Sequence, residues 1–396
     1  MIVEHLSLKD FRNYAEAELE LGPGANVLVG RNGQGKTNLA EAIAYLATLG
    51  SHRVSADAPL VREGESAAFV RARLRHGART VMLDLQISKQ GSNKARIGGA
   101  PVKPGELPRY AQVVLFAPED LQIVRGNPSE RRKFADQLLI QRTPRMAAVL
   151  GDYDRTLRQR TTLLKSARAR GMKADALPTL DVWDDKLVAL GSEIIDARTA
   201  LAHDLQGPLT AAYEGVAGAD HRPELSWTLT IHGADPEEGD DADGGGEGPT
   251  AAQFRSALAQ KRAAELERGL SLVGPHRDDL LLRVRGLPVK GYASHGESWS
   301  VSLALRLAAA ELLRRESPGG DPILILDDVF AELDADRRSR LAGVVSDYEQ
   351  VIVTAAVAGD VPEPLRGSAI RIDHGRVLGP LADHPFDTAH PEQADG

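Results

Sequence analysis

The sequence predicts an α/β fold in which the two ends of the chain form one domain, split by a long helical insertion. Short strand-like apolar runs occur before about residue 118 and again after about residue 269. Between about residues 119 and 225, strand patterns are absent, and long stretches rich in Arg, Leu and Ala are typical of helices. We therefore expect residues 1–118 and 269–379 to form the α/β domain and residues 119–268 to form an α-helical arm domain.

The order of the expected elements follows from hydrophobic periodicity and turn residues. Asn26 to Val29 is a short apolar run typical of a strand buried on both faces, and residues 37–49 place apolar side chains at helical spacing behind it. Alternating patterns predict strands over Ala15–Leu21 and Val81–Ile87. The other expected elements are strands over Val113–Phe116, Leu225–Ile231, Leu280–Val284 and Ile323–Leu326, and helices over about 129–141, 144–170, 181–217, 251–268 and 297–315.

Composition excludes several classes of chemistry. The 396 residues include no Cys, which rules out disulfides, thiolate metal sites, cysteine nucleophiles and cysteine-ligated iron–sulfur clusters. Aromatic residues are few, which argues against a protein that binds rows of stacked bases. No apolar run reaches membrane-spanning length and the N-terminus lacks a signal-peptide pattern, so we expect a cytoplasmic protein with no membrane partner.

The net charge of −8, taken as a mean, argues against nucleic acid as a partner. Its distribution weakens that argument. Residues 235–248 hold seven acidic residues and no Lys or Arg, and the tail 380–396 holds four; both are expected to be disordered. The remainder carries 48 basic and 45 acidic residues. Residues 121–173 contain 13 Lys or Arg against four Asp or Glu, a net of +9, which is either a solvated helical surface or a polyphosphate-binding face.

A phosphate-binding motif follows the buried strand at Asn26–Val29. It fits G-x-x-x-x-G-K-[ST] and comprises Gly30, Arg31, Asn32, Gly33, Gln34, Gly35, Lys36 and Thr37. Its glycines let successive backbone N–H groups point at phosphate oxygens, and the N-terminus of the following helix adds positive potential. We expect this loop to bind ATP, with Lys36 on the β- and γ-phosphates and the Thr37 hydroxyl on Mg²⁺.

A carboxylate pair ends a second buried strand, at Asp327 and Asp328. Asp327 is expected to hold Mg²⁺, through water, and Asp328 to orient the attacking water as a general base. The other reading is that the pair only caps a strand. Compact kinases and small GTPases rarely separate the two motifs by 290 residues, the interval from the phosphate-loop Lys36 to Asp327. The nucleotide site is therefore expected to come from both ends of the chain.

These motifs, with several others in the same order, resemble the RecF family of bacterial recombination mediators, which is related to SMC proteins and ABC-type ATPases. The resemblance spans about residues 1–355 and is carried by Leu8–Tyr14, Asn38–Ala42, Phe116–Leu121, Gly126–Pro128, Arg131–Phe134, Gly274–Asp279 and Asp327–Asp334. It implies an ABC-type, SMC-like P-loop ATPase head split by a helical arm domain. It also implies an ATP-dependent homodimer that binds single-stranded and duplex DNA at gaps and junctions. In recombinational repair and replication restart, such a protein acts with RecO and RecR in placing RecA on DNA.

The resemblance assigns two motifs to the dimer interface. Ser294, Gly296 and Glu297 occupy the position of the signature motif, which contacts the γ-phosphate held by the other subunit. The spacing Ser294-x-x-Glu297 is also a capping box opening a helix, which by itself explains the same residues. His295 departs from the usual form of the motif, and we assign it no chemistry. Asp334 matches the loop that crosses the interface.

Further matches supply weaker assignments around the phosphates. Arg53 matches an arginine that reaches the nucleotide phosphates in SMC-like heads, and Glu119 a residue near Mg²⁺, although Glu119 reads equally as part of a surface turn. Thr354 stands near the position where ABC transporters carry a switch histidine and could touch the catalytic water, so hydrolysis should be slow and DNA-stimulated, a switch rather than a source of turnover. Gly274–Asp279 reads either as a structural strand entry with an internal Arg277–Asp pair or as a segment with a catalytic role, and the structural reading is slightly favoured.

The basic segment supplies the candidate DNA contacts. Phosphate contacts dominate non-specific DNA binding and carry no sequence information, so a contiguous basic face matters more than any single residue. The candidates are Arg131, Arg132, Lys133, Arg155, Arg158, Lys165 and Arg168. Two alternatives to an ATP-switched DNA clamp stay open: a P-loop phosphotransferase acting on a small molecule, and a scaffold that binds ATP without hydrolysing it.

Overall fold

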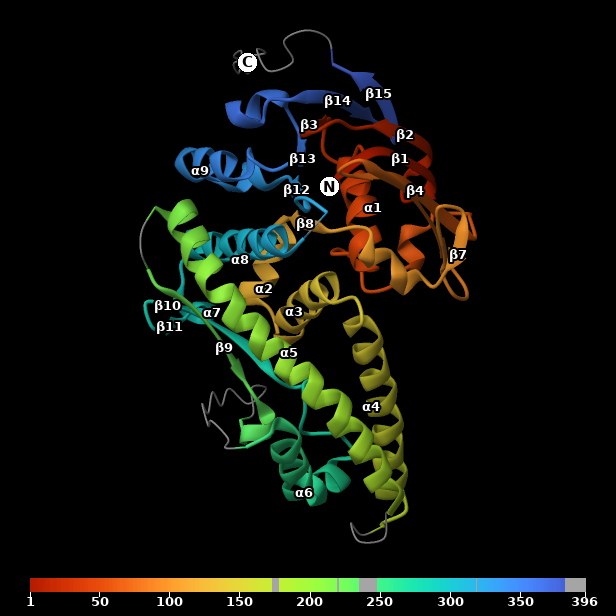
Figure 1. Ribbon diagram of the computed structural model, residues 1–396, viewed down its shortest axis with the longest axis vertical. Coiled ribbons are helices and arrows are strands. Elements are labelled where there is room, and N and C mark those ends of the chain that lie inside the picture. The colour runs from red at the N-terminus through yellow and green to blue at the C-terminus, as the bar shows by residue number, and fades with distance from the viewer. Residues whose placement is uncertain (173–177, 219–220, 235–247, 318, 382–396) are drawn as a thin grey trace, which may run out of the picture. The chain divides into compact units, whose positions relative to one another are not determined.

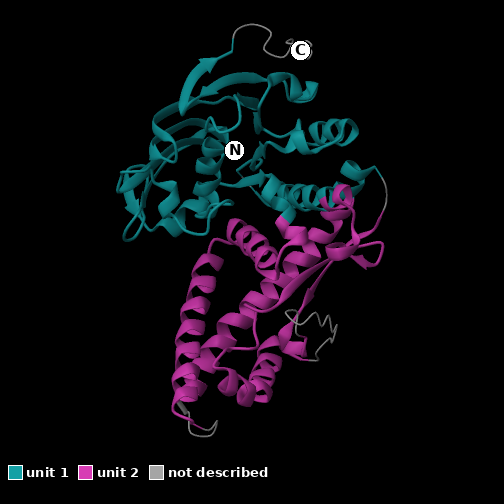
Figure 2. Cartoon of the chain, turned by 180° about the vertical axis from the view of Figure 1, so that it is seen from behind, with its two compact units in different colours: residues 1–121, 211–220, 299–396 teal, residues 122–210, 221–298 magenta. Residues whose placement is uncertain are grey.

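The computed structural model describes residues 1–172, 178–218, 221–234, 248–317 and 319–381, and within it the chain forms two compact units. Unit 1 contains residues 1–121, 211–220 and 299–396, and unit 2 contains residues 122–210 and 221–298 (Figure 2). Both ends of the chain thus enter unit 1, as the sequence predicts. Helices α5 (Pro178–Ala217) and α8 (His295–Glu316) contribute residues to both units.

Unit 1 contains two six-stranded sheets (Figure 1). The antiparallel sheet has the strand order β2-β1-β4-β5-β6-β7, and the second sheet has the order β15-β14-β3-β13-β12-β8, parallel except for β15. The elements are β1 (Ile2–Phe11), β2 (Tyr14–Glu20), β3 (Gly24–Val29), α1 (Lys36–Thr48), β4 (Ala67–His76), β5 (Arg79–Ser88), β6 (Lys94–Ile97), β7 (Ala100–Val102), β8 (Val113–Phe116), β12 (Ile323–Asp327), α9 (Ala335–Val345), β13 (Gln350–Ala355), β14 (Ser368–Asp373) and β15 (Arg376–Pro380).

The core of unit 1 joins both sheets through α1. Every residue of α1 from Leu39 to Ala47 is buried, so this helix is apolar nearly all round rather than along one face. Its side chains belong to one hydrophobic cluster with β1, β4 and β5 of the antiparallel sheet and with β8, β12 and β13 of the parallel sheet. Helix α1, which follows the phosphate loop, therefore shares one hydrophobic core with both sheets of unit 1.

The parallel sheet brings the two sequence motifs to one edge. Strands β12 and β13 are buried throughout, which fits their continuous apolar sequences. Strand β13 lies between β3 and β12, with Asp327 opposite Thr354 and Ala355 opposite Val29. Because the strands run parallel, the ends of β3, β13 and β12 meet at the same edge. The phosphate loop and the Asp327-Asp328 pair leave the sheet there.

Unit 2 combines long helices with a three-stranded antiparallel sheet of order β11-β10-β9. Its elements are α2 (Leu121–Arg125), α3 (Pro128–Arg142), α4 (Met146–Ala169), most of α5, β9 (Pro223–Thr228), α6 (Thr250–Arg268), β10 (Asp279–Val284), β11 (Leu287–Pro288), α7 (Val289–Tyr292) and the first turn of α8.

The boundary between the units differs from the sequence expectation at residues 269–298. These were expected in the α/β head, but β10 pairs with β9 along its whole length, from Asp279 opposite Thr228 to Val284 opposite Pro223. An apolar run predicts a strand without specifying its partner, so the sequence could not assign this strand to a sheet. Pro380, expected in the disordered tail, is the last residue of β15. The rest of the expected acidic loop and tail lies outside the described residues, apart from Gly248 and Leu381.

Buried arginines hold the interior of unit 2 together. Arg160 on α4 is fully buried and donates to Asp184 at 2.6 Å, Glu265 at 2.6 Å and the Ser271 hydroxyl at 2.9 Å. Arg198 on α5 makes a two-fold contact with Asp136, at 2.8 Å for both pairs. A buried charge is tolerated only when paired and hydrogen-bonded in this way, so these arginines are structural.

The segment Gly274–Asp279 belongs to the same buried network. The Asp278 carboxylate accepts from the Thr230 hydroxyl at 2.7 Å and backbone N–H at 2.8 Å, and burial raises the pKa of Asp278 to about 6. His276 lies 2.7 Å from the Tyr153 hydroxyl, and burial lowers the pKa of His276 to about 3. These contacts favour the structural reading of the segment.

Within the described residues, no helix is both long and apolar enough to cross a membrane.

Replacing Arg160 by Met should destabilise unit 2 strongly. The change leaves the fully buried Glu265 carboxylate without its main charged partner, and loss of one member of a buried pair costs about 3–5 kcal/mol. Arg155→Met on the same helix is the control, because Arg155 is exposed and its ion pair with Asp152 is worth about 0–1 kcal/mol. Urea unfolding measures both. Equal stabilities for the two variants would contradict the structural role.

Candidate nucleotide-binding site

Backbone geometry explains the glycines of the phosphate loop. Gly33 and Gly35 have φ values of +80° and +120°, in the range that side chains disfavour. Gly30 has ordinary φ, but a Cβ there would clash with the carbonyl oxygen of Ile372 on β14. The sequence therefore needs glycine for two separate reasons: conformation at positions 33 and 35, and close approach of a neighbouring strand at position 30.

The loop is held from outside at Gln34. Its carbonyl oxygen accepts from the Gly375 backbone N–H at 3.0 Å and from the Asn13 side-chain amide at 3.1 Å. Its side-chain oxygen accepts from the His374 backbone N–H at 2.6 Å. The β14–β15 turn and the β1–β2 turn thus fix the loop between them. Neither contact was foreseen from the sequence.

Lys36 is the first residue of α1 and is only 3% exposed. Its ammonium donates to the carbonyl oxygens of Gly30 at 2.7 Å and Arg31 at 3.3 Å, so the side chain curls back over the loop. The first turn of α1 carries no acidic residue. A buried cation and the backbone N–H groups of a helix N-terminus therefore face the same loop, which is the arrangement that binds phosphate.

Thr37, Asp327 and Thr354 form a hydrogen-bonded cluster at the edge of the parallel sheet. One Asp327 carboxylate oxygen accepts from the Thr37 hydroxyl at 3.0 Å and from the Thr354 hydroxyl at 2.7 Å. Burial raises the pKa of Asp327 from 3.8 to about 6, against these hydrogen bonds, which lower it; the nearby Asp328 raises it further. The two motifs that the sequence placed 290 residues apart are in direct contact.

Asp328 has left-handed backbone geometry, with φ +52° and ψ +18°, which Asp tolerates better than most residues. Its N–H donates to the Thr354 hydroxyl at 2.9 Å, and its side chain is partly exposed. Thr354 therefore orients both acidic residues. The structure places the Thr354 hydroxyl on Asp327 and on the backbone of Asp328, and its contact with a catalytic water stays a prediction.

The donor set fits a hard divalent cation. Thr37 and Asp327 offer a hydroxyl and a carboxylate oxygen, the ligand types that Mg²⁺ prefers. Among the described residues there is no group of three or more His, Asp or Glu side chains that could hold a metal by themselves. A Mg²⁺ ion held here would complete its shell with water and nucleotide phosphates, as Mg²⁺ commonly does.

Glu41 on α1 organises the arginines next to the loop, and sequence reasoning missed it. The carboxylate is fully buried and accepts two hydrogen bonds from Arg12, at 2.7 and 2.8 Å. It also accepts from the Ser51 hydroxyl, which in turn accepts from the Arg53 N–H at 2.9 Å. Burial opposes ionisation of Glu41, but the Arg12 and Ser51 contacts hold its pKa below the ordinary value.

Arg53 is thereby held beside the phosphate-loop helix. Its guanidinium donates to the Asn38 side-chain oxygen at 2.9 Å and lies 3.9 Å from Glu41. Arg12, Asn13, Asn38 and Arg53 line one cavity of about 650 Å³. The sequence signs of this arrangement were Arg53 and the motif segments Leu8–Tyr14 and Asn38–Ala42, none of which specifies a contact.

Glu119 lies on a short 3-10 helix, Pro118–Asp120, directly after β8. Its side chain is exposed. Burial raises the pKa of Asp327 and lowers that of His52, and the negative charge of Glu119 adds to the first effect and opposes the second. It is therefore within electrostatic reach of the cluster around Asp327, although no hydrogen bond ties it there in the described part of the chain.

The signature-like segment lies in unit 2 and forms the expected capping box. The Glu297 carboxylate accepts from the Ser294 N–H at 2.9 Å, and the Ser294 hydroxyl accepts from the Glu297 N–H at 3.2 Å. The hydrogen bonds to Ser294 lower the pKa of Glu297, which also pairs with Arg285. His295 lies 3.4 Å from an Arg125 nitrogen. The helix begins at His295, two residues earlier than expected.

Asp334 caps α9 in unit 1. Its carboxylate accepts from the Arg337 N–H and from the Arg337 side chain, both at 2.9 Å, and the backbone contact lowers its pKa. The side chain is exposed. A helix cap accounts for Asp334 within one chain.

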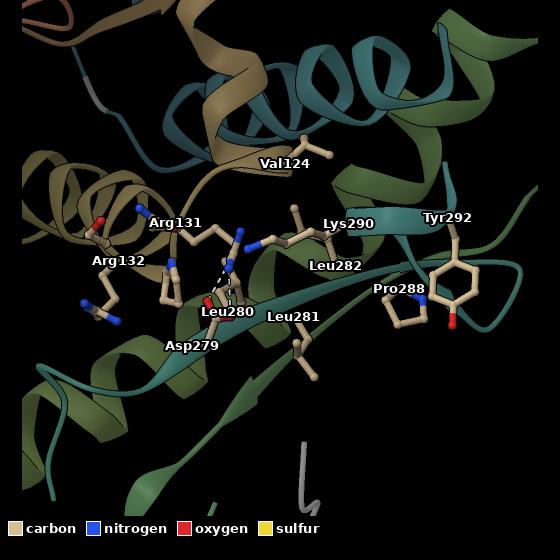
Figure 3. A pocket seen from close by; sticks show the side chains of 13 residues that line it. Val124, Arg131, Arg132, Asp279, Leu280, Leu281, Leu282, Pro288, Lys290 and Tyr292 are labelled. Carbon is tan, nitrogen blue, oxygen red and sulfur yellow. Dashed lines mark hydrogen bonds and ion pairs between the residues drawn. The ribbon is translucent and has the colours of Figure 1, made fainter. Parts of the chain in front are cut away.

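The predicted DNA contacts in unit 2 divide into buried and exposed arginines. Arg131 is 4% exposed and makes a two-fold contact with Asp279, at 2.7 and 2.8 Å (Figure 3). Arg131 is therefore structural, which corrects its assignment to DNA binding: its charge is already satisfied inside the fold. Arg132 is half-buried and donates to the Asp278 carbonyl oxygen at 2.8 Å. Burial lowers the pKa of Arg132.

The remaining candidates are exposed. Lys133 lies on α3, and α4 carries the other four, Arg155, Arg158, Lys165 and Arg168. Arg155 pairs with Asp152, and Arg168 donates to the Arg268 carbonyl oxygen at 3.1 Å. The four side chains on α4 are exposed and can reach a phosphate backbone, whereas the buried Arg160 on the same helix cannot.

Comparison with known proteins places these features in one family. The profile of the RecF/RecN/SMC N-terminal domain matches residues 2–364. The chain is 56% identical over 405 residues to the DNA replication and repair protein RecF of Clavibacter michiganensis subsp. michiganensis, covering 100% of this chain and 99% of that protein. It is 58% identical over 384 residues to the RecF of Leifsonia xyli subsp. xyli, covering 96% and 100%.

Solved structures agree with this placement. A structure of the recombination mediator protein RecF with ATP, in the RecFOR pathway, superposes with a TM-score of 0.84 at 27% identity and covers 96% of this chain and 97% of that one. The Smc head of Pyrococcus furiosus, bound to the C-terminal domain of ScpA, superposes with a TM-score of 0.51 at 15% identity, covering 96% and 95%. The latter likeness concerns the fold alone.

Asp327→Asn should stabilise the metal-free protein at high pH. In the folded chain the neutral carboxyl is favoured, because the folded pKa of about 6 exceeds the ordinary 3.8. The free energy of unfolding of the wild type therefore falls by up to roughly 3 kcal/mol as the pH rises from about 4 through 6. The uncharged Asn of the variant avoids that loss.

Urea unfolding between pH 4 and 8, without Mg²⁺ or nucleotide, measures this effect. The variant should gain stability relative to the wild type at pH 8 and lose that advantage near pH 4. Asp347→Asn, on an exposed residue, controls for the change in net charge. A stability difference that does not vary with pH would contradict the assignment.

Proposed function

The chain belongs to the RecF family of DNA replication and repair proteins, and we propose that it acts as an ATP-switched DNA clamp. The observation that carries the proposal is the contact between the phosphate loop and the Asp327 strand through Thr37. A small-molecule phosphotransferase would have no use for a signature-like capped helix or for exposed cations along α4.

ATP bound by the loop would join two copies of the chain. Lys36 and the helix N-terminus hold the phosphates, and Thr37 and Asp327 hold Mg²⁺. The N-terminus of α8 in the second copy, with Ser294 and Gly296, supplies N–H groups toward the γ-phosphate. Asp334 lies at the interface of the two copies. Each dimer then contains two composite sites, and neither site is complete within one chain.

Hydrolysis is proposed to be slow and to act as a switch that releases the dimer. Asp328 is the general-base candidate, with a side chain one methylene shorter than the Glu more usual at this position. Thr354 is engaged by both acidic residues, at 2.7 Å from Asp327 and 2.9 Å from the Asp328 N–H. No imidazole occupies its place. Single-turnover hydrolysis measurements would separate this proposal from an ATP-binding scaffold that never hydrolyses.

DNA is proposed to bind the ATP dimer through exposed cations, including Arg155, Arg158, Lys165 and Arg168 on α4. Such contacts neutralise phosphates without reading sequence, which suits a protein that acts at gaps and junctions. In the same proposal, the clamp cooperates with RecR and RecO so that RecA is placed on single-stranded DNA. ATP and DNA should then strengthen one another's binding.

Size measurements with and without ATP test the composite site. Wild type should dimerise with ATP and Mg²⁺, whereas Lys36→Ala should lose both ATP binding and dimerisation. Ser294→Ala should keep ATP binding in the monomer but lose the dimer, with a small loss of helix-cap stability of about 0.5–2 kcal/mol.

Mixing the two variants gives a sharper result. A mixed pair contains one site made of intact Lys36 from one copy and intact Ser294 from the other, so dimers should return in part. The matched control is each variant at the same total concentration. ATP-dependent dimers of Lys36→Ala, or no recovery on mixing, would contradict the composite-site mechanism.

A further inference from the structure

The solvent face of the antiparallel sheet in unit 1 contains a groove that the nucleotide site does not use. It has a volume of about 750 Å³ and is lined by residues of β1, β4, β5, β6, β7 and the segment after β7. This face is formed by alternate residues whose neighbours point into the core, as expected for a sheet with one solvated side. The phosphate loop contributes no residue to it.

The groove is strongly basic. Its lining includes Lys9, Arg71, Lys94, Arg96 and Lys103, against one acidic residue, Asp84. Asp84 is already paired with Arg71. Lys9, Lys94, Arg96 and Lys103 are exposed, and none of the four forms an ion pair with another described residue. Four exposed cations that lack an ion-pair partner and lie in one groove indicate that the groove binds an anionic partner.

Arginines outside the groove on the same sheet contrast with this pattern. Arg73 pairs with Glu4 at 3.2 Å and Glu20 at 3.5 Å, and Arg75 pairs with Glu4 at 2.7 Å. Arg73 and Arg75 are therefore neutralised, whereas Lys94, Arg96 and Lys103 have no ion-pair partner among the described residues. Lys9 stands opposite Glu16 of β2 in the register but forms no ion pair with it. The uncompensated charge coincides with the groove.

An exposed aromatic residue lies among the cations. Phe69 on β4 is 43% exposed, and in the sheet register it stands directly opposite Lys9 of β1. On its other side it stands opposite Gln86 of β5, which stands opposite Lys94 of β6. Lys9, Phe69, Gln86 and Lys94 thus form one row across four strands. With neighbouring strands about 4.8 Å apart, the row spans about 14 Å.

We propose that this groove binds single-stranded DNA, with phosphates on Lys9, Lys94 and Arg96 and a base stacked on Phe69. This inference rests on the proposed DNA-binding function and deepens it, because it names the strand type and a surface in unit 1 apart from the helical arm. Single-strand binding proteins combine a cationic path with aromatic platforms for unpaired bases. A span of about 14 Å corresponds to about four nucleotides at the 3.4 Å rise of a stacked strand.

The aromatic residue favours a single strand over the other anionic partners. Duplex DNA presents phosphates to the cations, but its bases are stacked on one another and leave Phe69 without a partner. An acidic peptide would use the cations and has no need of a flat ring. The scarcity of aromatic residues in the chain argues against rows of stacked bases, and a single platform among cations is compatible with it.

Fluorescence anisotropy tests the groove, using the full-length protein with ATP and Mg²⁺. The probes are a labelled 15-nucleotide oligothymidine, a duplex of the same length and an oligoglutamate peptide. Phe69→Ala should weaken binding to the single strand about five-fold or more, with an unchanged salt dependence and an unchanged duplex affinity. The paired change Lys94→Gln with Arg96→Gln should reduce the slope of log affinity against log salt by about 1.4, since each lost phosphate contact accounts for about 0.7.

Arg79→Gln is the matched control, because Arg79 is an exposed cation at the far end of β5 and does not line the groove. Thermal unfolding verifies that these surface changes leave the fold intact. Wild-type affinity for the single strand in both groove variants would overturn the inference while leaving the proposed function in place. A second result would also overturn it: the Lys94→Gln with Arg96→Gln variant loses binding to oligoglutamate, and Phe69→Ala keeps wild-type affinity for the single strand. That result would indicate an acidic protein partner. A wild-type protein that binds no DNA at all would overturn the proposed function together with the inference.

Discussion

The hydrogen bond from Thr37 to Asp327 joins residues 290 positions apart, and the nucleotide site depends on it. It is possible only because β13 lies between β3 and β12 in a parallel sheet, which brings the ends of three strands to one edge. The chain between the two motifs has to leave the sheet and return. That requirement accounts for a head divided in sequence and for a second unit inserted between its halves.

Two buried carboxylates near the phosphate loop have pKa values that their surroundings shift in opposite directions. Glu41 accepts hydrogen bonds from Arg12 and Ser51, which hold its pKa below the ordinary value against the effect of burial. Its carboxylate therefore fixes the position of the neighbouring arginines. Asp327 accepts from the Thr37 and Thr354 hydroxyls, and burial raises its pKa to about 6. An anion held at such a cost in desolvation gains from a cation, which is the physical reason that Mg²⁺ suits the position.

The arginines of unit 2 show that the net charge counted from the sequence differs from the charge exposed at the surface. The segment 121–173 carries a net of +9, yet Arg131 and Arg160 are buried against carboxylates and contribute nothing to the surface field. The exposed residues on α4 are the ones that a polyanion could meet. In unit 1, the cations of the sheet groove are scattered along the sequence from Lys9 to Lys103 and form a cluster only through strand register.

Much of the molecule followed from the sequence, because local patterns report local structure. The phosphate loop, the buried strands β3, β8 and β12, the capping box at Ser294 and Glu297, and the long helices of unit 2 were all predicted from periodicity and residue type. The separation of Lys36 from Asp327 also predicted a site built from both ends. Tertiary structure alone decided which strand pairs with which, as β10 shows by joining β9, and which charges are buried. Those outcomes depend on contacts between residues far apart in the chain, which no local pattern encodes.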